Sequence, residues 1–370
     1  MRVCLICVEF FINKSGGFGR ATRTIGRELA KRGVEVFAIV PQQGDQGLRE
    51  VHDGVTVLAF PKSRPWDAYR LSKEVNADIY HSCEPSTTTV FAMQAMPNKK
   101  HVITFRDPRN WDDWVKEFER PARSKFQVVT NWLFEANALV TRAVRRADSV
   151  HSIGRYLVPK IKKIYGVDSE FLPTPVAVTG VARKSDTPTV GWLARWDRVK
   201  RPEIFLQMAQ KFPHVNFRFA GSALDQDWVK HLKDTYGSAP NLEWVGRFDQ
   251  FRDPEAHSAF LDEAWIMVNA STKEAMPNAF IEAAAHGCSI LSGLDPDGFG
   301  SKFGYHAKPS DGKKYPDADD FGRGLAWLLE NDRWKERGEL ARAHIVENFE
   351  TEVAMQKHIE VYRNHLGITD

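Results

Sequence analysis

Short apolar runs alternate with longer amphipathic segments along almost the whole chain, and this alternation predicts strands and helices of βα units. In the first half we predict strands over Arg2–Glu9, Val34–Val40, Val55–Phe60, Asp78–His81, His101–Phe105, Ser149–Ser152 and Ser169–Leu172. Helices are predicted over Gly19–Arg32, Trp66–Val75, Thr87–Ala95, Lys125–Arg146 and Arg155–Tyr165. Strands that alternate with helices in this way are typical of a parallel sheet.

A second series of the same kind follows residues 173–188, a proline-rich segment that we interpret as an interdomain linker. Its strands are predicted over Thr189–Leu193, Asn216–Ala220, Asn241–Val245, Trp265–Asn269 and Ser289–Leu291. No strand is predicted beyond Phe303, and helices are predicted over Asp319–Glu330, Arg333–Asn348 and Thr351–Asn364. The linker predicts domains over 1–175 and 176–350, followed by a terminal helical segment over 351–370. It counts against a TIM barrel, the rival fold of this length.

The composition is that of a soluble globular protein of 370 residues, long enough for two hydrophobic cores. No apolar run approaches the ~20 residues that span a bilayer. The first apolar run leads into glycines, which suits a strand better than a signal peptide. Cys4 and Cys7 spell C-x-x-C on opposite faces of that strand, so we expect two half-buried thiols in a reducing cytoplasm.

The charge is unevenly distributed between the two halves. Residues 1–175 carry 27 Lys and Arg against 19 Asp and Glu, whereas the remainder carries 24 against 29. A basic first domain is compatible with an anionic substrate or with peripheral contact to the inner face of a membrane. We do not predict nucleic-acid binding from it.

Two glutamates flank the predicted start of a helix within residues 273–287. Pro277 suits the first helical position, so Glu274 lies in the preceding loop and Glu282 in the second helical turn. The N–H groups of Asn278, Ala279 and Phe280 are predicted to lack intrahelical acceptors and to carry the positive end of the helix dipole. An anion site between two carboxylates suits a nucleotide-sugar. Its pyrophosphate would rest on the helix N-terminus, and a hydroxylated ring on either side of the pyrophosphate would form hydrogen bonds.

The same segment closely resembles the Glu-x7-Glu signature of family 4 retaining glycosyltransferases, E-G-F-P-N-x-x-x-E-A-x-A-x-G. Ala275 replaces the usual glycine, and Gly287 closes the helix. The resemblance implies that Glu274 contacts sugar hydroxyls and that Glu282 holds the ribose. The alternative is an amphipathic helix with two solvated glutamates.

A basic loop, residues 194–201, follows the first strand of the second domain. Clustered cations repel one another unless an anion lies between them, and a leaving diphosphate is such an anion. The loop is similar to the family pattern G-R-L-x-x-x-K-G, with Trp196 in place of leucine. The resemblance assigns Arg195 and Lys200 to the diphosphate, while Arg198 and Arg201 are expected to be surface or supporting residues. A solvated basic loop is the alternative.

The sequence Ser-Gly-Gly-Phe-Gly-Arg, residues 15–20, joins the first strand to the first helix. Glycines there let a backbone approach a ligand, although a tight turn alone would also use them. Their position resembles the family's G-G loop beside the acceptor and the transferred sugar. We therefore select Gly16 and Gly17 as donor-binding residues.

Three further candidates belong to the sugar or acceptor site. Where the family usually reads V-x-T-x-H-D, this chain has Arg106 in place of the histidine and keeps Asp107. Arginine is no general base, but it can bind an anionic substituent, a phosphate or a hydroxyl. A simple pairing with Asp107 or Glu84 is the alternative. His81 falls near a family H-x-H position whose second histidine is Cys83 here.

An aromatic and basic segment, residues 108–134, contains Trp111, Trp114 and Phe118 at helical spacing. We expect them to contribute to the core and to an acceptor pocket, with Trp111 as the candidate residue. Contact with a membrane interface is the alternative.

Taken together, the resemblance implies an α/β protein of the GT-B class, with two doubly wound, Rossmann-like domains facing each other across a cleft. The 351–370 helix would pack back on the first domain. The implied activity is transfer of a hexose from a UDP- or GDP-linked sugar to a hydroxyl of a glycan, lipid-linked or small-molecule acceptor, with retention and without a metal or other cofactor. A sugar phosphorylase, an epimerase and a non-catalytic binding protein are the alternatives.

Overall fold

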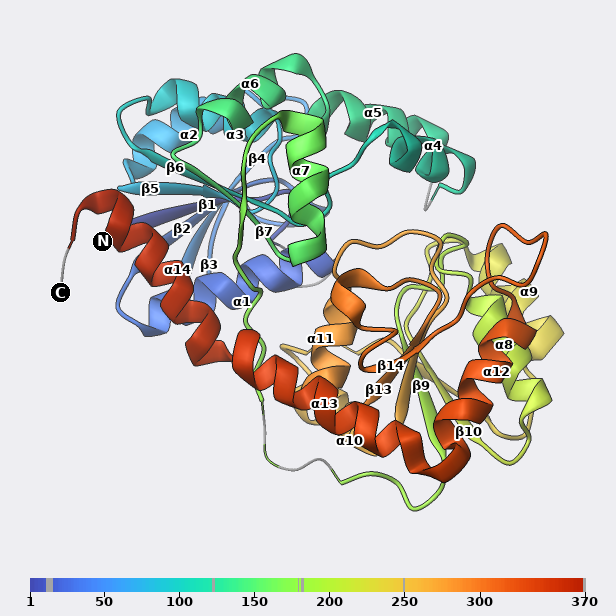
Figure 1. The fold of residues 1–370 in the computed structure, drawn as a ribbon. Helices are drawn as coiled ribbons and strands as arrows, with labels where there is room; N and C mark the ends of the chain where they lie inside the picture. Colours follow the sequence, from blue (N-terminus) through green and yellow to red (C-terminus); the bar gives the residue numbers. More distant parts are fainter. Residues whose placement is uncertain (11–15, 122–123, 179, 181–182, 249, 369–370) are drawn as a thin grey trace. The chain divides into compact units, whose positions relative to one another are not determined.

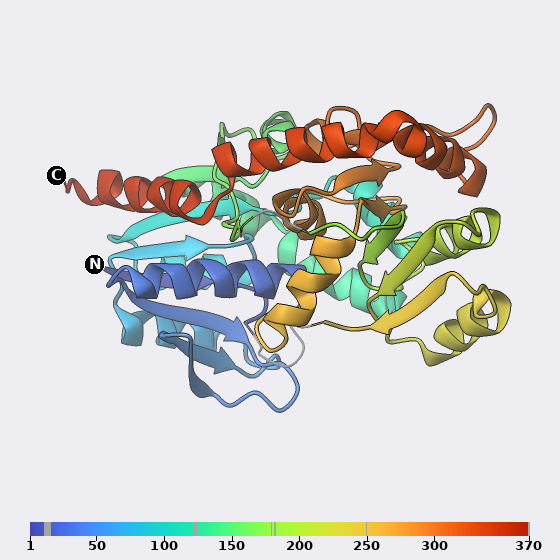
Figure 2. The same ribbon diagram turned by 90° about the horizontal axis from the view of Figure 1, so that it is seen from below.

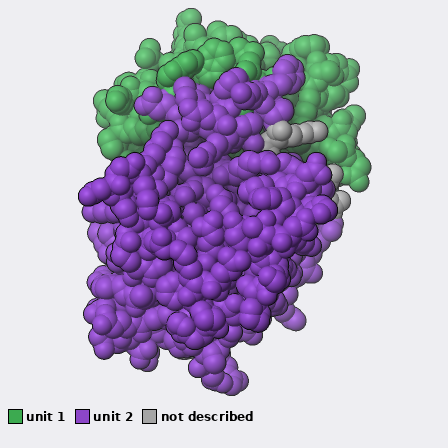
Figure 3. Space-filling view, turned by 90° about the vertical axis from the view of Figure 1, so that its right-hand side faces the viewer, with its two compact units in different colours: residues 1–111, 128–175, 351–370 green, residues 112–127, 176–350 purple. Residues whose placement is uncertain are grey.

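The computed structural model describes residues 1–10, 16–121, 124–178, 180, 183–248 and 250–368. Ser15 of the glycine loop and positions 179, 181 and 182 of the predicted linker lie outside these ranges. The chain forms two compact units (Figure 3). Unit 1 comprises residues 1–111, 128–175 and 351–370, and unit 2 comprises residues 112–127 and 176–350. Residues 112–127 thus belong to the second unit, although they precede the linker.

Unit 1 contains a sheet with the strand order β3-β4-β2-β1-β5-β6-β7-β8 (Figure 1). Its strands are β1 Arg2–Ile6, β2 Glu35–Pro41, β3 Arg49–His52, β4 Val55–Phe60, β5 Ile79–Ser82, β6 Lys100–Phe105, β7 Ser149–Ser152 and β8 Glu170–Phe171. All neighbouring strands are parallel except β3, which pairs antiparallel with β4. The seven predicted strands are confirmed, with shifts at their ends.

The sequence pattern missed β3, because this short edge strand is largely exposed and has no apolar run. It is joined to β4 by Asp53 and Gly54, which both have positive φ. An Asp-Gly pair of this kind is a strong hairpin signal. The turn residues, rather than the residues of β3 itself, could therefore have predicted this hairpin.

Helices cover the faces of this sheet: α1 Gly17–Lys31, α2 Asp67–Val75, α3 Thr87–Ala95, α6 Ala138–Arg146, α7 Val158–Tyr165 and α14 Thr351–Leu366, with a 3₁₀ turn over Arg155–Leu157. The single helix predicted over residues 125–146 is wrong, because α5 Lys125–Glu135 ends before α6 begins. Asn137 caps α6, and its side-chain oxygen accepts hydrogen bonds from the N–H groups of Leu139 and Val140.

The C-terminal helix α14 belongs to unit 1, as Figures 1 and 2 show beside α1. Met355 and Tyr362 are buried in the core formed by β1, β2 and α1. His358 Nε2 lies 3.1 Å from the carbonyl oxygen of Pro173, which attaches the helix to the end of the sheet. Cys4 in β1 and Cys7 just after it are both buried rather than half-buried, since helices cover both faces of the sheet.

Unit 2 contains a parallel sheet with the order β11-β10-β9-β12-β13-β14. Its strands are β9 Thr189–Leu193, β10 Asn216–Ala220, β11 Leu242–Gly246, β12 Ile266–Asn269, β13 Ser289–Ser292 and β14 Gly304–His306. The prediction that no strand follows Phe303 is wrong. β14 has only three residues and pairs with β13. It begins at Gly304, where a Cβ would lie 1.8 Å from the carbonyl oxygen of Ile290, so only glycine fits this close pairing.

The helices of unit 2 are α8 Pro202–Lys211, α9 Gln226–Tyr236, α10 Pro254–Glu263, α11 Asn278–Ala285, α12 Ala318–Leu329 and α13 Arg333–Asn348, with 3₁₀ turns over Pro296–Gly298 and Glu330–Asp332. α4 Trp111–Glu119 precedes them, and all but its first residue belong to this unit. Pro202 begins α8, as predicted. Trp192, Phe205 and Phe219 pack with ring centroids 5.5–5.7 Å apart and form the centre of the core.

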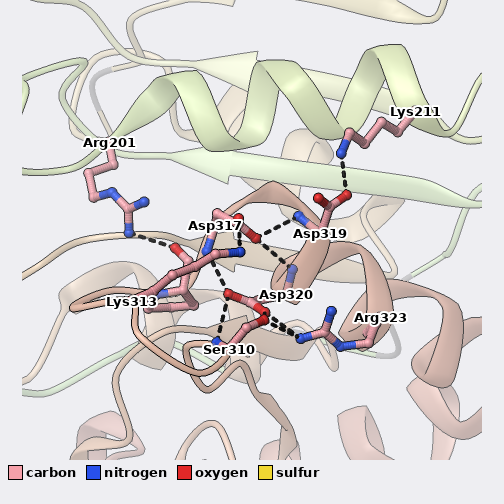
Figure 4. Close-up of polar contacts among 9 residues, drawn as sticks. Arg201, Lys211, Ser310, Lys313, Asp317, Asp319, Asp320 and Arg323 are labelled. Atoms are coloured by element: carbon pink, nitrogen blue, oxygen red, sulfur yellow. Dashed lines mark hydrogen bonds and ion pairs between the residues drawn. The ribbon is translucent and has the colours of Figure 1, made fainter.

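A polar network holds the loop after β14 against the start of α12 (Figure 4). Asp320 is buried and accepts hydrogen bonds from Ser310 and from the backbone N–H of Asp317 at 2.9 Å. Burial opposes ionisation, but these hydrogen bonds hold the pKa of the Asp320 carboxyl well below its usual value. Arg201 donates to the carbonyl oxygen of Pro316 at 2.8 Å, so the loop is also tied to the start of α8.

Among the described residues, no helix combines the length and the apolar character needed to cross a bilayer.

Candidate active site

Lys200 and Glu274 meet at the carboxyl edge of the second sheet. Lys200 lies in the loop after β9, and Glu274 lies in the loop after β12. Their Nζ and Oε1 atoms are 2.5 Å apart, and the side chains are 16% and 15% exposed. The Thr272 N–H donates to the carbonyl oxygen of Val199 at 3.0 Å, which holds the two loops together. An ammonium group and a carboxylate group that solvent can still reach therefore lie together in one site.

Glu274 has further polar partners from its own loop. Its Oε1 accepts a hydrogen bond from Ser271 Oγ at 2.9 Å and from Asn269 Nδ2 at 3.3 Å. These contacts orient the carboxylate at the end of β12 independently of Lys200. The carboxylate is thus held in place even if the lysine moves to another anion.

The basic loop is shaped by a tight turn before α8. The Lys200 N–H donates to the carbonyl oxygen of Asp197 at 2.8 Å, and Arg201 adopts the left-handed conformation with φ 58°. Arg195 is 56% exposed, and its Nη1 lies 3.0 Å from Asp197 Oδ2. Burial raises the pKa of the Asp197 carboxyl, while the charges of Arg195 and Lys200 oppose that shift. Asp197 is a supporting residue that the sequence analysis did not select, although it is the one acid within the basic loop.

The other members of this loop have structural partners. Trp196 is buried and stacks on Phe219 with ring centroids 4.6 Å apart, so an aromatic residue fills the core position where leucine is common in the family pattern. Arg198 lies 2.7 Å from Asp225 and over the ring of Trp228. These contacts agree with the expectation that Arg198 is a supporting residue.

Helix α11 begins one residue later than predicted. Pro277 is the N-cap with φ −65° and ψ 125°, so its extended ψ places Asn278 at the first helical position. Asn278 and Ala279 present their N–H groups at the positive end of the helix. The prediction that the Phe280 N–H lacks an acceptor is wrong, because it donates to the carbonyl oxygen of Pro277 at 3.0 Å.

Glu282 lies in α11 four residues after Asn278, as the spacing predicted. Its Oε2 is 3.4 Å from Nε2 of His257, which α10 contributes, and both side chains are 12% exposed. His257 is thus a neighbour of this carboxylate that sequence reasoning missed. No sequence pattern marked His257, because a contact between two different helices does not correspond to a fixed spacing of residues along the chain.

In unit 1, Glu9 lies at the N-terminus of α1. Gly16 is the N-cap of this helix and Gly17 its first residue, and the Gly19 N–H donates to Glu9 Oε1 at 2.9 Å. A Cβ at Gly16 would lie 2.7 Å from Glu9 Oε1. The glycine therefore permits the close approach of a carboxylate from the same chain. Glu9 was the acidic residue in the first apolar run, which could have marked it.

Arg106 follows β6 directly and is only 2% exposed. Its Nη1 donates to Thr174 Oγ1 at 3.0 Å, and burial lowers the pKa of its guanidinium. Its backbone N–H and that of Asp107 donate to Glu84 Oε2 at 2.6 and 3.0 Å. Burial, followed by the charge of Glu135, raises the pKa of Glu84 to about 8, so this carboxyl is mostly protonated at neutral pH.

The alternative, in which the Arg106 side chain simply pairs with Asp107 or Glu84, is wrong. Asp107 instead pairs with Arg109 at 2.8 Å, and Arg109 also binds Glu135 at 3.0 Å. Within the described ranges, no carboxylate oxygen lies within 4.0 Å of the Arg106 guanidinium.

His81 is completely buried and lies in the core of unit 1. Its Nδ1 is 2.6 Å from the Tyr362 hydroxyl and its Nε2 is 2.7 Å from Thr104 Oγ1. Burial lowers the pKa of His81 well below its usual value. These contacts favour a structural role, in which a neutral imidazole joins α14 to β5 and β6.

Trp111 is 69% exposed at the start of α4, whereas Trp114 is buried. The Trp111 ring packs edge-on against Trp132 with centroids 6.5 Å apart. Of the three aromatic residues at helical spacing, only Trp114 therefore lies in the core, whereas Trp111 and Phe118 are exposed, and Trp111 remains available to a ligand.

Two family models match the chain in succession: Glycosyltransferase Family 4 over residues 15–179, and Glycosyl transferases group 1 over residues 179–345. A comparison of the sequence with curated proteins found no match.

Several solved structures have the same fold. A sucrose-phosphate synthase from Thermosynechococcus elongatus is 15% identical, with a TM-score of 0.75 and full coverage of both chains. HepE from Anabaena, solved with UDP and glucose, is 15% identical with a TM-score of 0.71, covering 97% of this chain and 98% of its own. The pneumococcal O-GlcNAc transferase GtfA, solved with UDP and GlcNAc, is 10% identical with a TM-score of 0.68, covering 99% of each chain. The two consecutive family matches show that the chain belongs to the family 4 glycosyltransferases, and the solved structures show that it has the GT-B fold.

Proposed function

We propose that this glycosyltransferase moves a hexose from a UDP-linked sugar to an acceptor hydroxyl, with retention of the anomeric configuration. The acceptor would be a glycan, a lipid-linked sugar or a small molecule. UDP is the nucleotide named for HepE and for GtfA, and this likeness supports it over GDP and ADP.

The observation that carries the proposal is the pairing of Lys200 with Glu274. A diphosphate carries at least two negative charges, so its oxygens compete with the Glu274 carboxylate for the Lys200 ammonium. Once released, Glu274 is still held by Ser271 and Asn269 and can accept a hydrogen bond from a sugar hydroxyl. The pair thereby provides a cation for the leaving group and an acceptor for the sugar.

In the proposed reaction, the bond between the anomeric carbon and the diphosphate oxygen breaks while the acceptor oxygen attacks the same face. The departing electron pair becomes a negative charge on the diphosphate, where Lys200, Arg195 and the N-terminus of α11 stabilise it. The acceptor proton moves to the leaving phosphate oxygen, so the step needs no separate protein base. We further propose that the reaction requires no metal ion.

Calorimetric titration of the full-length chain with UDP, GDP and ADP tests the donor site. We expect selective binding of UDP, weakened at least tenfold in Lys200→Ala because one charge-assisted contact is lost. Lys211→Ala is the matched control, since Lys211 pairs with Asp319 at the end of α8 outside the proposed site. Turnover is followed as UDP released from a panel of UDP-sugars. If none of the three nucleotides binds, the proposal fails.

A further inference from the structure

Arg106 is a buried cation for which the described part of the protein supplies no ion-pair partner. Thr174 is the hydrogen-bond partner of its Nη1, and its Nε is buried without any partner. The ordinary explanation of a buried arginine is a paired carboxylate, because burying an isolated charge without a partner is strongly unfavourable. That explanation does not apply at this position.

The neighbouring acids are committed elsewhere. Glu84 Oε2 accepts two backbone N–H groups, and Asp107 binds Arg109. The remaining titratable groups that act on Arg106 electrostatically, Cys7 and Cys83, have pKa values raised by burial and are neutral thiols. Glu84 acts on the guanidinium electrostatically without contacting it, so among the described residues the guanidinium has no ion-pair partner.

The position of Arg106 points to a ligand rather than to folding. It is the first residue after β6, at the carboxyl edge of the sheet, which is where doubly wound sheets bind ligands. A guanidinium also offers parallel N–H donors that fit two oxygens of a carboxylate or a phosphate.

We propose that Arg106 binds an anionic group of the substrate, either a carboxylate on the transferred sugar or a phosphate on the acceptor. This inference rests on the proposed function and narrows its substrate class. The two sources share the same recognition chemistry, namely two negatively charged oxygens that lie in one plane with the guanidinium and satisfy its Nε.

The test compares anionic with neutral ligands on the full chain. In the donor arm, the affinity for UDP-glucuronate is compared with that for UDP-glucose. In the acceptor arm, glucose 6-phosphate is compared with glucose in the presence of saturating UDP. Each comparison is made for the wild type, for Arg106→Gln and for Arg70→Gln, which removes the same charge from an exposed helix position.

We expect the wild type to prefer the anionic ligand at least tenfold in one arm, and that arm identifies the source of the anion. Arg106→Gln should lose the preference, and Arg70→Gln should keep it. No preference in either arm, or a preference that persists in Arg106→Gln, overturns the inference. Should Arg106→Gln fail to fold, Arg106→Lys replaces it, because a single ammonium should reduce the preference without removing the charge.

UDP binding separates this inference from the proposed function. If the wild type binds UDP but shows no preference for anions, the inference about Arg106 fails and the donor site stands. If the wild type does not bind UDP, the proposed function itself fails.

Discussion

Replacing Glu274 by glutamine should strengthen UDP binding while reducing turnover. In the wild type, Lys200 must exchange its contact with Glu274 at 2.5 Å for a contact with the diphosphate. A hydrogen bond to a charged group contributes about 1.5–3 kcal/mol, and about 1.4 kcal/mol corresponds to a tenfold change in affinity. Removing the competing carboxylate should therefore tighten UDP binding roughly 10- to 100-fold.

Turnover should change in the opposite direction. A glutamine keeps an amide oxygen for Ser271 and Asn269, so the loop geometry is preserved. It lacks the negative charge that would interact with the reacting sugar, and loss of such a transition-state contact typically costs about 10²-fold. The opposite signs of the two effects distinguish competition for Lys200 from a general loss of structure.

Calorimetry with UDP and a UDP-release assay measure the two quantities on the same preparation. Glu330→Gln is the matched control, because Glu330 pairs with Arg333 at 2.6 Å in the same unit. It should alter neither quantity by more than about twofold, since the Glu330 side chain is 63% exposed and an exposed ion pair contributes little. Weaker UDP binding by Glu274→Gln, or unchanged turnover, would refute the reasoning about competition.

Four further outcomes are expected. Burial raises the pKa of Glu84 from 4.5 to about 8 in the folded state, so the wild type loses stability as the pH rises through that window. Denaturant titrations should show Glu84→Gln gaining up to about 4 kcal/mol over the wild type between pH 5 and pH 9, and a difference that stays constant would contradict this. Gly221 has φ 144°, and a Cβ there would lie 2.0 Å from the Ala194 carbonyl oxygen. Gly221→Ala should therefore lower the free energy of unfolding, measured by denaturant titration, by about 3 kcal/mol. Gly180→Ala is the control, because open space surrounds a Cβ at Gly180, and it should change the free energy of unfolding by less than about 0.5 kcal/mol. Tyr362→Phe removes the hydroxyl bonded to His81 and should cost about 1–3 kcal/mol in thermal unfolding; equal stability would mean that this contact is not structural. Turnover should persist in excess EDTA, and its loss with recovery on adding a divalent cation would disprove metal independence.

The sequence alone predicted the local structure of this protein well. Strands β7, β9 and β10 and helices α3 and α13 begin and end at the predicted residues, because apolar periodicity, helix caps and proline positions act over a few residues. The Glu-x7-Glu segment placed Glu282 on α11 for the same reason. Short or exposed elements such as β3 and β14 escaped, since they have too little apolar surface to leave a pattern.

Only the tertiary structure decided what each candidate residue contacts. Lys200 and Glu274 are 74 positions apart and meet because their strands are neighbours in one sheet. His81, a site candidate by position, is a core residue because α14 brings Tyr362 to it from 281 positions away. Arg106 lost its expected carboxylate partners because Glu84 binds the backbone and Asp107 binds Arg109. Periodicity reports burial along one element, whereas partners and charge compensation depend on which distant elements the fold brings together.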